Sequence, residues 1–320
     1  MKVRKAVITA AGRGVRLFPV ADTVQKAMLP LIDADGLCKP AIQIIAEEAF
    51  ASGIEEICIV CAPGDEGRYI ENFKLLRSNL LEAHKGVEWA QEQAEKIDNL
   101  LHRVSFTVQH KMMGYGHAVN SAKDFVGNDS FLLLLGDHLY VSDPGYERCA
   151  KQLINLAEQE NCAVSGVNPT NEAEISKYGT LTGKSVLNTP GIYEIENILE
   201  KPTISLAELE LQTPGLRHGY YLCFFGMHVL TPMIFDLLED YHQQASEASG
   251  YLLTPALQDL IAKDKYLALE VKGRRYDLGK KYGMLEAQMA LSMSGTEKDA
   301  ALTTLVNTMA EASRHTSVSL

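Results

Sequence analysis

The sequence predicts an α/β fold in which helices cover both faces of a mixed, mostly parallel β-sheet. Short apolar runs of strand length alternate along the chain with segments of helical periodicity. The run at residues 131–135 is apolar at every position, which is typical of a strand buried on both faces. With 320 residues, of which 46% are hydrophobic and 22% charged, the chain can form one large domain or two small ones.

The first half of the chain shows the alternation most clearly. Expected strands span residues 5–10, 57–61, 104–109 and 131–135, and expected helices span 40–52 and 117–125. Residues 65–102 are charged and helix-favouring, so we expect a helical insertion there. Since ligands of such sheets bind beyond the carboxyl ends of the strands, the glycine-rich turn after Ala10 and the Gly136-Asp137 turn are expected at one edge.

The second half is less regular. Expected strands span residues 161–167, 220–227 and 267–271, and expected helices span 234–241, 255–262 and the stretch from about 280 onward. No internal repeat and no clear linker divides the chain. We therefore expect one domain over residues 1–290, with the insertion at 65–102, followed by a helical and polar tail at 291–320.

Charge and hydropathy exclude several classes of partner. Thirty basic against forty-one acidic residues give a formal charge of -11, and no dense basic block is present, so we expect no nucleic-acid partner. The apolar runs are far too short to span a membrane. The N-terminal apolar run is also too short for a signal peptide and continues into the glycine-rich turn, so a cytoplasmic protein is expected.

Two of the six cysteines have a spacing that can indicate a metal or redox site. Cys58 and Cys61 lie in an apolar strand pattern. Side chains three positions apart on a strand point to opposite faces of the sheet. We therefore expect two inert, buried thiols rather than a pair that acts together.

The glycine-rich turn is the first candidate for chemistry. Gly12 and Gly14 follow a buried strand, where glycines let backbone N–H groups approach a phosphate closely. The run has Leu17 where a dinucleotide-binding fingerprint has its third glycine, and it also lacks the Gly-Lys-Ser/Thr of a P-loop. Arg16 and Lys26 remain as cations that either neutralise phosphate oxygens or are solvated loop charges.

Ordered motifs beyond this turn resemble one family. The pattern Ala-Ala-Gly-x-Gly-x-Arg-x-x-Pro, followed by Lys-Ala-Met-Leu-Pro-Leu, resembles the opening of sugar-1-phosphate nucleotidyltransferases, most nearly the bacterial UTP–glucose-1-phosphate uridylyltransferases. Gln109 and Gly-Tyr-Gly-His-Ala-Val then resemble that family's glutamine and Leu-Gly-Leu-Gly-His-Ala-Val. Gly-Asp at 136–137, Tyr-Gly at 178–179, Glu-Lys-Pro at 200–202 and Tyr-Asp-Leu-Gly at 276–279 complete a resemblance over about residues 3–290.

The resemblance implies a Rossmann-like fold of the nucleotide-diphospho-sugar transferase type and a defined reaction. Such an enzyme transfers a uridylyl group from UTP to a sugar-1-phosphate, here most nearly glucose-1-phosphate, and releases pyrophosphate. A sugar phosphate oxygen attacks the α-phosphorus in line, without a covalent enzyme intermediate. The protein therefore contributes positioning and electrostatic stabilisation.

By the same resemblance, Asp137 and Asp277 would hold Mg²⁺, which prefers hard oxygen ligands. Arg16 would grip the β- and γ-phosphates, and Lys26 would neutralise charge near the α-phosphate. Read without the resemblance, Asp277 could instead be a turn carboxylate paired with Arg274 or Arg275. We expect His138 to point away from the ion.

The remaining site residues are also implied by the resemblance. Residues placed at the nucleotide are Ala11, Gly12, Gly14, Gln109 and Gly114, and residues placed at the sugar phosphate are Tyr178, Gly179, Glu200, Lys201 and Gly226. Lys201 would hold the phosphate and Glu200 would accept hydrogen bonds from sugar hydroxyls. His117 is expected to begin a helix. By family habit the protein would form a homo-oligomer, with the tail after about Gly283 as its interface.

Departures from the family pattern leave alternatives open. Ala21 and Asp22 replace a common Thr-Lys pair, and His138 follows Asp137 where the family has a second Asp. Residues 250–256 replace Gly-Glu-Ile-Gln-Leu-Thr-Asp with a more apolar segment, and 226–230 replace Gly-Arg-Tyr-Val-Leu. Another sugar-1-phosphate or dTTP as substrate, or a non-catalytic nucleotide-sugar binding homologue, are therefore alternatives. Retention of all five proposed charged groups favours the enzyme, and the missing third glycine disfavours a nicotinamide dehydrogenase.

Overall fold

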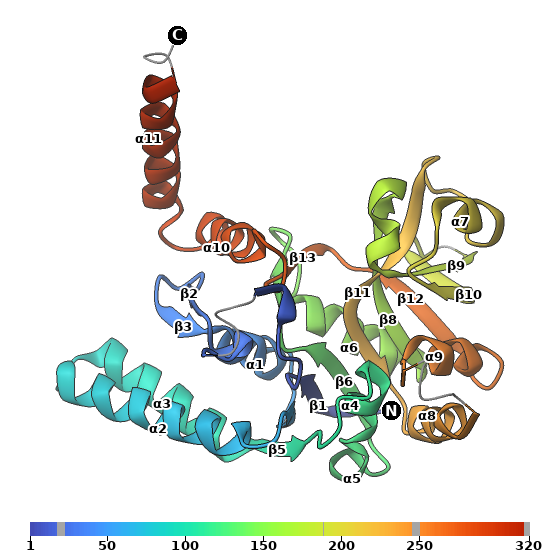
Figure 1. Ribbon diagram of the computed structural model, residues 1–320, viewed down its shortest axis with the longest axis horizontal. Coiled ribbons are helices and arrows are strands. Elements are labelled where there is room, and N and C mark those ends of the chain that lie inside the picture. The colour runs from blue at the N-terminus through green and yellow to red at the C-terminus, as the bar shows by residue number, and fades with distance from the viewer. Residues whose placement is uncertain (18–22, 188, 245–249, 317–320) are drawn as a thin grey trace.

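The computed structural model describes residues 1–17, 23–187, 189–244 and 250–316 (Figure 1). The departure at Ala21 and Asp22 therefore lies outside the described residues. A nine-stranded sheet of order β5-β4-β1-β6-β11-β8-β12-β10-β9 forms the centre of this part of the chain. The predicted mixed sheet with helices on both faces is confirmed, but among the described residues the sheet is not mostly parallel, because four of its strand pairings are parallel and five are antiparallel.

The N-terminal half supplies the parallel part of the sheet. β1 (Val3–Thr9) lies between β4 (Glu56–Cys61) and β6 (Ser130–Leu135), and β5 (Val104–Val108) pairs with β4. All three pairings are parallel, so the carboxyl ends of these strands meet at one edge as predicted. Cys58 and Cys61 belong to two different hydrophobic clusters, on opposite faces of β4, as strand geometry requires.

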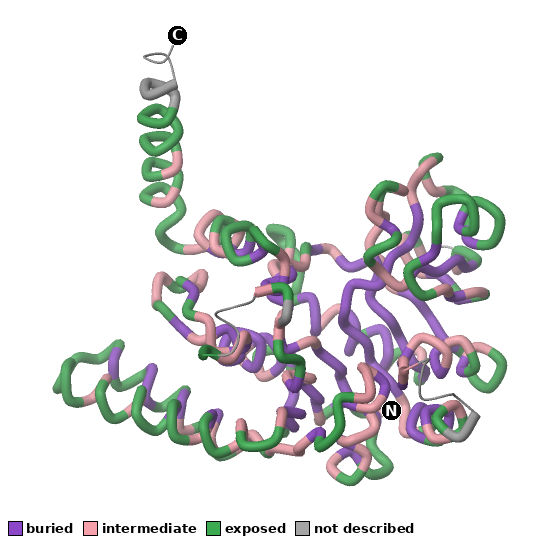
Figure 2. The backbone as a smooth tube through the Cα atoms, in the orientation of Figure 1, coloured by how far each residue is buried: buried purple, intermediate pink, exposed green. Residues whose placement is uncertain are grey.

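Helices pack on both faces of this sheet. One cluster joins α1 (Ala41–Ala51), α6 (Cys149–Glu160) and α10 (Gly283–Ser294), and the other joins α4 (Tyr115–Asn120), α8 (Met233–Gln244) and α9 (Thr254–Ile261). The buried strands lie between these layers (Figure 2). The predicted helix at 117–125 is divided into α4 and α5 (Lys123–Val126).

The predicted insertion forms a helical hairpin. α2 (Asp65–Ala83) and α3 (Glu88–Arg103) run side by side and extend from the body of the molecule (Figure 1). Tyr69, Phe73 and Ile97 form its buried side, and most of its other residues are exposed. The helical hairpin lies beside β5, at one edge of the sheet, and the strands of the second half of the chain extend to the opposite edge.

The C-terminal half adds mainly antiparallel strands. β8 (Ala163–Asn171), β11 (Tyr220–Leu230) and β12 (Tyr266–Glu270) correspond to predicted strands. The sequence analysis missed β9 (Gly179–Ser185), β10 (Ile192–Glu200), α6 and α7 (Ile204–Glu210). β9 carries few apolar residues, and the alternation of β10 is interrupted by a register shift between Ile195 and Asn197, which weakens the strand signal in both.

Two small two-stranded sheets accompany the main sheet in the described part of the chain. β7 (His138–Ser142) pairs with β13 (Gly273–Asp277) in antiparallel register, with Asp277 opposite His138. β2 (Pro30–Ile32) pairs with β3 (Cys38–Pro40). The described connections contain the short 3₁₀ helices η1 (Val15–Leu17), η3 (Lys26–Met28) and η4 (Glu172–Lys177).

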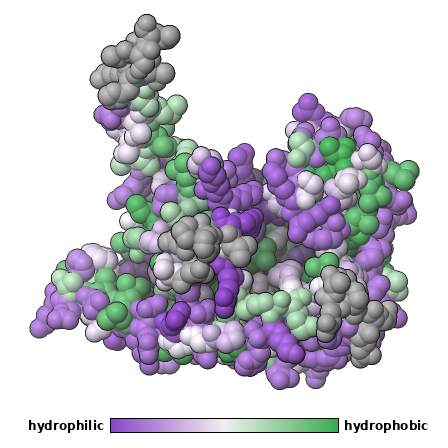
Figure 3. Space-filling view, viewed as in Figure 1, coloured by the Kyte–Doolittle hydropathy of each residue, from purple (hydrophilic) through white to green (hydrophobic). Residues whose placement is uncertain are grey.

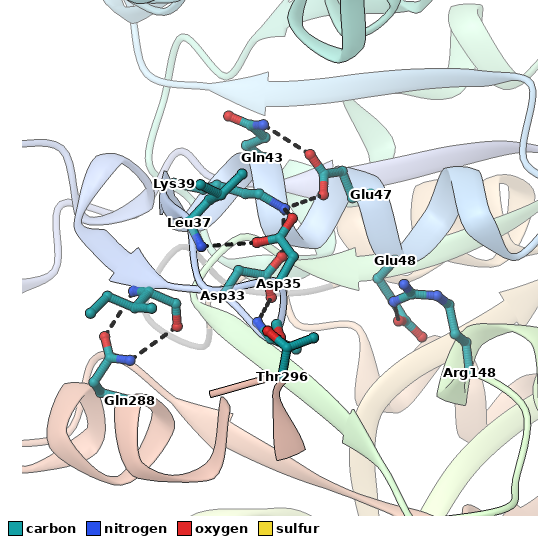
Figure 4. A network of polar contacts seen from close by, with 12 residues as sticks. Asp33, Asp35, Leu37, Lys39, Gln43, Glu47, Glu48, Arg148, Gln288 and Thr296 are labelled. Atoms are coloured by element: carbon teal, nitrogen blue, oxygen red, sulfur yellow. Dashed lines mark hydrogen bonds and ion pairs between the residues drawn. The ribbon is translucent and has the colours of Figure 1, made fainter. Parts of the chain in front are cut away.

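Lys39 fixes the β2–β3 hairpin to the body (Figure 4). Its buried ammonium contacts the carboxylates of Asp33 and Asp35 at 2.7 Å and of Glu47, on α1, at 2.9 Å. Burial alone would lower the pKa of Lys39, but the hydrogen bonds to these three carboxylates outweigh it and raise the pKa. The three N–H donors of the Lys39 ammonium are therefore matched by three carboxylates.

The two C-terminal helices differ in how they contact the rest of the molecule. α10 packs against β2 and β13, and α11 (Lys298–Thr316) projects away from the rest of the molecule (Figure 1). None of the helices in the described part of the chain has the length and apolar character needed to cross a membrane.

Candidate active site

A cavity of about 500 Å³ opens where the parallel strands end. It forms because β1 and β6 approach each other closely at this edge: the Gly136 N–H donates to the Thr9 carbonyl at 2.9 Å. A Cβ at position 136 would lie 2.8 Å from the Ala10 Cβ, so only glycine fits. Six of the lining residues were proposed as site residues from the sequence, namely Ala11, Gly12, Lys26, Gln109, Gly114 and Asp137.

The loop after β5 forms one wall of the cavity. The Gln109 amide donates from Nε2 to the Gly114 carbonyl at 3.1 Å, and the same nitrogen lies 3.0 Å from His117 Nδ1. Gly114 has φ +128°, a conformation that favours glycine. His117 lies in the first turn of α4, as expected. Gly14, with φ +63°, accepts from the Leu17 N–H and is outside the cavity lining.

Two carboxylates from distant parts of the sequence meet beside the cavity. Asp137 follows β6, and Asp277 ends β13, whose pairing with β7 places it opposite His138. Ligand atoms of these three side chains lie within 4.8 Å of one another. His138 Nδ1 lies 2.8 Å from Asp137 Oδ1, so the expectation that this ring points away from the carboxylates is not met.

Each carboxylate also contacts a predicted cation. Lys26 forms an ion pair with Asp137, and Arg16 donates to both oxygens of Asp277, at 3.0 and 3.4 Å. The alternative partners considered for Asp277, Arg274 and Arg275, are therefore incorrect. The Gly279 N–H donates to Asp277 Oδ1 at 2.7 Å, and so gives this carboxylate a further hydrogen bond.

The environment keeps Asp137 ionised. Burial alone would raise the pKa of its carboxyl group, but the hydrogen bond and charge of His138 and the ion pair with Lys26 outweigh this and hold the pKa well below its usual range. The site therefore combines fixed anions with fixed cations, an arrangement suited to a metal ion together with phosphate groups.

The predicted sugar-side residues lie on paired strands. Tyr178 and Gly179 lie at the start of β9, and Glu200 and Lys201 at the end of β10, with Glu200 opposite Gly179 in the register. Lys201 Nζ lies 3.3 Å from Glu200 Oε1. Lys201 has φ +46°, an uncommon value for a residue other than glycine.

Gly226 connects this group to the carboxylates. It has φ +78° within β11, at an irregularity of the pairing with β8, and a Cβ there would lie 2.9 Å from Leu135. The Tyr140 hydroxyl donates to its carbonyl at 2.8 Å. Gly226 therefore lies against the residue that precedes the Gly136-Asp137 turn.

The sequence analysis missed four residues of this region. Lys280 donates to the Tyr178 hydroxyl at 3.0 Å, and the Arg275 guanidinium lies 4.1 Å from the Tyr178 ring centroid. Thr254 donates to Glu200 Oε2 at 2.6 Å, and Tyr115 lines the cavity. The basic character of residues 272–281 was a signal in the sequence for Lys280 and Arg275. No such signal indicated Thr254, because its partner is 54 residues away in the sequence.

A family model described as Nucleotidyl transferase matches residues 5–294. UTP–glucose-1-phosphate uridylyltransferase 2 of Streptococcus pyogenes serotype M1 is 35% identical over 292 residues, which is 90% of each chain. UTP–glucose-1-phosphate uridylyltransferase of Staphylococcus epidermidis is 33% identical over 305 residues, covering 92% of this chain and 94% of the relative.

Solved structures with the same fold agree with these relatives. UDP-glucose pyrophosphorylase complexed with UDP-glucose is 28% identical, with a TM-score of 0.71, over 90% of this chain and 98% of that chain. The UTP-bound enzyme from Acinetobacter baumannii is 26% identical, with a TM-score of 0.74, over 95% of this chain and 98% of that chain.

Proposed function

The chain belongs to the nucleotidyl transferase family, and we propose that it transfers a uridylyl group from UTP to glucose-1-phosphate. In this reaction a phosphate oxygen of the sugar-1-phosphate forms a bond to the α-phosphorus of UTP. The bond between the α-phosphorus and the bridging oxygen breaks, and pyrophosphate leaves. The products are UDP-glucose and pyrophosphate, and no bond to the protein is needed.

One observation carries this proposal: the ion pair of Asp137 and Lys26 lines a cavity at the strand ends, and a second carboxylate, Asp277, lies within 4.8 Å of Asp137 and is paired with its own cation. The polyanionic substrates of this reaction need fixed positive charge, and a metal ion needs fixed oxygen ligands. The arrangement offers both within one edge of the sheet. A dinucleotide-binding site would need neither group at these positions.

The donor set fits a magnesium ion. Asp137 and Asp277 offer carboxylate oxygens within 4.8 Å of each other, and such hard donors are those that Mg²⁺ prefers. We infer that these two residues hold Mg²⁺, with His138 as their neighbour. Bound there, the ion would neutralise charge on the phosphates of the nucleotide.

The cations would then act on separate phosphates. Lys26, which lines the cavity, would neutralise charge at the α-phosphate, and Arg16 would hold the β- and γ-phosphates that leave as pyrophosphate. Lys201 would hold the phosphate of glucose-1-phosphate. Each is a fixed charge placed before the reaction, so little reorganisation is required as charge moves toward the leaving group.

The remaining residues would orient the two substrates. Gln109 and Gly114 would contact the base edge, with the backbone of Ala11 and Gly12 nearby in the cavity lining. Glu200 would accept hydrogen bonds from hydroxyls of the sugar, beside Tyr178, Gly179 and Gly226. Amide and carboxylate groups suit the donors and acceptors of uracil and of a sugar ring.

A pyrophosphate-release assay with Mg²⁺ tests the proposal. UTP and dTTP should each be combined with glucose-, galactose-, N-acetylglucosamine- and mannose-1-phosphate. We expect UTP with glucose-1-phosphate to give the highest kcat/KM, and Asp137→Asn to abolish most of this activity in folded protein. Release with a different pair only would keep the reaction and change the substrate. Silence from every pair, in protein that still binds UTP, would instead indicate a non-catalytic nucleotide-sugar binding protein.

We further propose that the protein is a homo-oligomer that associates through α11. Leu302 and Val306 lie one turn apart on this projecting helix and are 46% and 56% exposed, and hydrophobic residues lie along the helix in the space-filling view (Figure 3). The double substitution Leu302→Glu/Val306→Glu should reduce the mass measured by light scattering. Thr303→Glu, also exposed on α11, is the matched control. An unchanged mass in both variants would contradict the proposal.

A further inference from the structure

A short segment that precedes and begins α9 contacts both halves of the proposed site. We call residues 251–254 the linking segment. Tyr251 and Leu253 in it are buried, and Thr254 is the first residue of α9. The segment lies in the stretch that departs from the family pattern, so its contacts were not predicted from the sequence.

On one side, the linking segment is bonded to the loop that carries Gly114. The Tyr251 N–H donates to the Met113 carbonyl at 2.7 Å, and the Gly116 N–H donates to the Tyr251 carbonyl at 2.8 Å. A Cβ at Gly114 or Gly116 would lie only 2.6 Å from a carbonyl oxygen of Tyr251 or Leu252, respectively. The two backbones are therefore in direct contact, with no side chain between them.

On the other side, the linking segment holds Glu200. The Thr254 hydroxyl donates to Glu200 Oε2 at 2.6 Å, while Lys201 Nζ lies 3.3 Å from the other oxygen. The main chain of β10 is tied to the same helix, because the Ile198 N–H donates to the Gln258 side chain at 2.7 Å. The position of β10 and the orientation of the Glu200 carboxylate, at the end of this strand, therefore both depend on contacts with α9.

We propose that Thr254 is a positioning residue that orients Glu200 for the sugar, and that the linking segment couples this carboxylate to the loop that holds the base. A carboxylate with one oxygen fixed by a hydroxyl presents its second oxygen in a defined direction. Because the same four residues are bonded to the loop at Met113 and Gly116, a displacement of that loop is transmitted to Glu200. This inference rests on the proposed function, which assigns the sugar to Glu200.

The first test removes only the hydroxyl. Thr254→Val keeps the shape of the side chain, and Thr254→Ser restores the donor. We expect Thr254→Val to raise KM for glucose-1-phosphate by about tenfold or more, the effect of losing one hydrogen bond to a charged group, with KM for UTP unchanged. Thr254→Ser should recover most of the wild-type KM. A general structural defect would change both KM values and would not be rescued by serine.

The second test perturbs the loop and reads the effect at the sugar. Gly116→Ala places a methyl group against the Leu252 carbonyl and should displace the linking segment. We expect it to raise KM for glucose-1-phosphate, and we expect this increase to shrink at least threefold when Thr254 is already valine. Equal and independent effects of the two substitutions would overturn the coupling.

The outcomes separate this inference from the proposed function. If the wild-type protein shows no turnover with UTP and any sugar-1-phosphate, the proposed function fails. If it turns over normally and Thr254→Val has the wild-type KM for glucose-1-phosphate, the positioning role fails while the function stands. Should Gly116→Ala not fold, the Thr254→Val and Thr254→Ser pair still decides the positioning role.

Discussion

Two lysines of similar burial have opposite surroundings. Lys39 is 4% exposed, and its three ammonium donors have three carboxylate partners, Asp33, Asp35 and Glu47. Lys26 is 13% exposed, lines the cavity at the strand ends and, in the described part of the chain, contacts one carboxylate, Asp137. An ammonium can donate three hydrogen bonds, so the first lysine is saturated whereas the second has capacity for a ligand.

The two lysines show how a buried polar group that stabilises the fold differs from one that can bind a substrate. A saturated group fixes neighbouring elements, here the β2–β3 hairpin against α1, and gains nothing from a ligand. A group with unused capacity at the edge of a cavity contributes less to the fold but can bind.

Lys39→Met should destabilise the protein by about 3 kcal/mol, because it leaves three partly exposed carboxylates close together without the cation that they share. Urea unfolding of wild type and variant at neutral pH measures the difference. Below the unfolding transition, kcat/KM should remain within about threefold of wild type, since Lys39 is not part of the proposed site. A large loss of activity in fully folded Lys39→Met would contradict the separation of the two networks.

Lys26→Ala should show the opposite behaviour. We expect kcat/KM for UDP-glucose formation to fall about 10²–10³-fold, the usual effect of losing a group that stabilises developing charge. The free energy of unfolding should fall by about 1 kcal/mol or less, because Asp137 keeps His138 as a partner and the cavity admits water. Destabilisation as large as that of Lys39→Met would show that Lys26 belongs to the fold.

Local signals made the centre of the site predictable. The apolar strand at 131–135 indicates that Gly136 and Asp137 lie at a strand end, and the glycine-rich turn after Ala10 indicates the same edge. Parallel strands with short connections bring such ends together by geometry alone. Lys26, Gln109 and Gly114 were placed in the site by the resemblance to the family, and the cavity lining contains all three.

Pairings between distant residues were not predictable from the sequence alone. Arg16 meets Asp277 across 261 positions, and this contact depends on the short β7–β13 pairing. The same is true of Thr254 and Glu200, whose contact requires β10, a strand with an irregular alternation. Such contacts result from tertiary packing, which residue periodicity does not encode.

His228 is a buried, hydrogen-bonded side chain whose protonation can change with pH. Burial, with the charge of Arg275, lowers the pKa of His228 from 6.5 to about 3, and its Nδ1 lies 2.5 Å from the Ser165 hydroxyl. The folded protein excludes the proton that the unfolded chain binds below pH 6.5. Stability from this residue is therefore complete above pH 6.5 and decreases as the pH falls from 6.5 toward 3.

His228→Asn removes this titration and keeps a polar side chain near Ser165. Between pH 7 and pH 5, we expect wild type to lose about 2 kcal/mol more unfolding free energy than the variant. Urea unfolding at the two pH values gives the difference, in which the other titrating groups cancel. Equal losses in the two proteins would mean that His228 is not held neutral by the fold.

Tyr115 and Tyr266 are buried tyrosines that differ in whether the hydroxyl has a hydrogen-bond partner, and we expect their substitution to have the smallest effect. The Tyr266 hydroxyl is bonded to Ser165, whereas the Tyr115 hydroxyl is buried with no hydrogen-bond partner among the described residues. The Thr9 hydroxyl lies near the Tyr115 hydroxyl and lowers the pKa of the phenol, but no hydrogen bond of ordinary geometry joins the two groups. Burial raises the pKa of Tyr115, and the carboxylates of Asp137 and Glu200 raise it further, so the phenol keeps its proton.

Tyr115→Phe should therefore leave the free energy of unfolding unchanged or increase it by up to about 1 kcal/mol, because an unpaired buried hydroxyl costs more than its absence. Tyr266→Phe should decrease it by about 1 kcal/mol, because it breaks a made hydrogen bond. Both changes remove one oxygen from a buried ring, so their difference isolates the partner. A loss in Tyr115→Phe as large as in Tyr266→Phe would show that this hydroxyl is bonded in solution, and would move Tyr115 from the group with unused capacity to the saturated one.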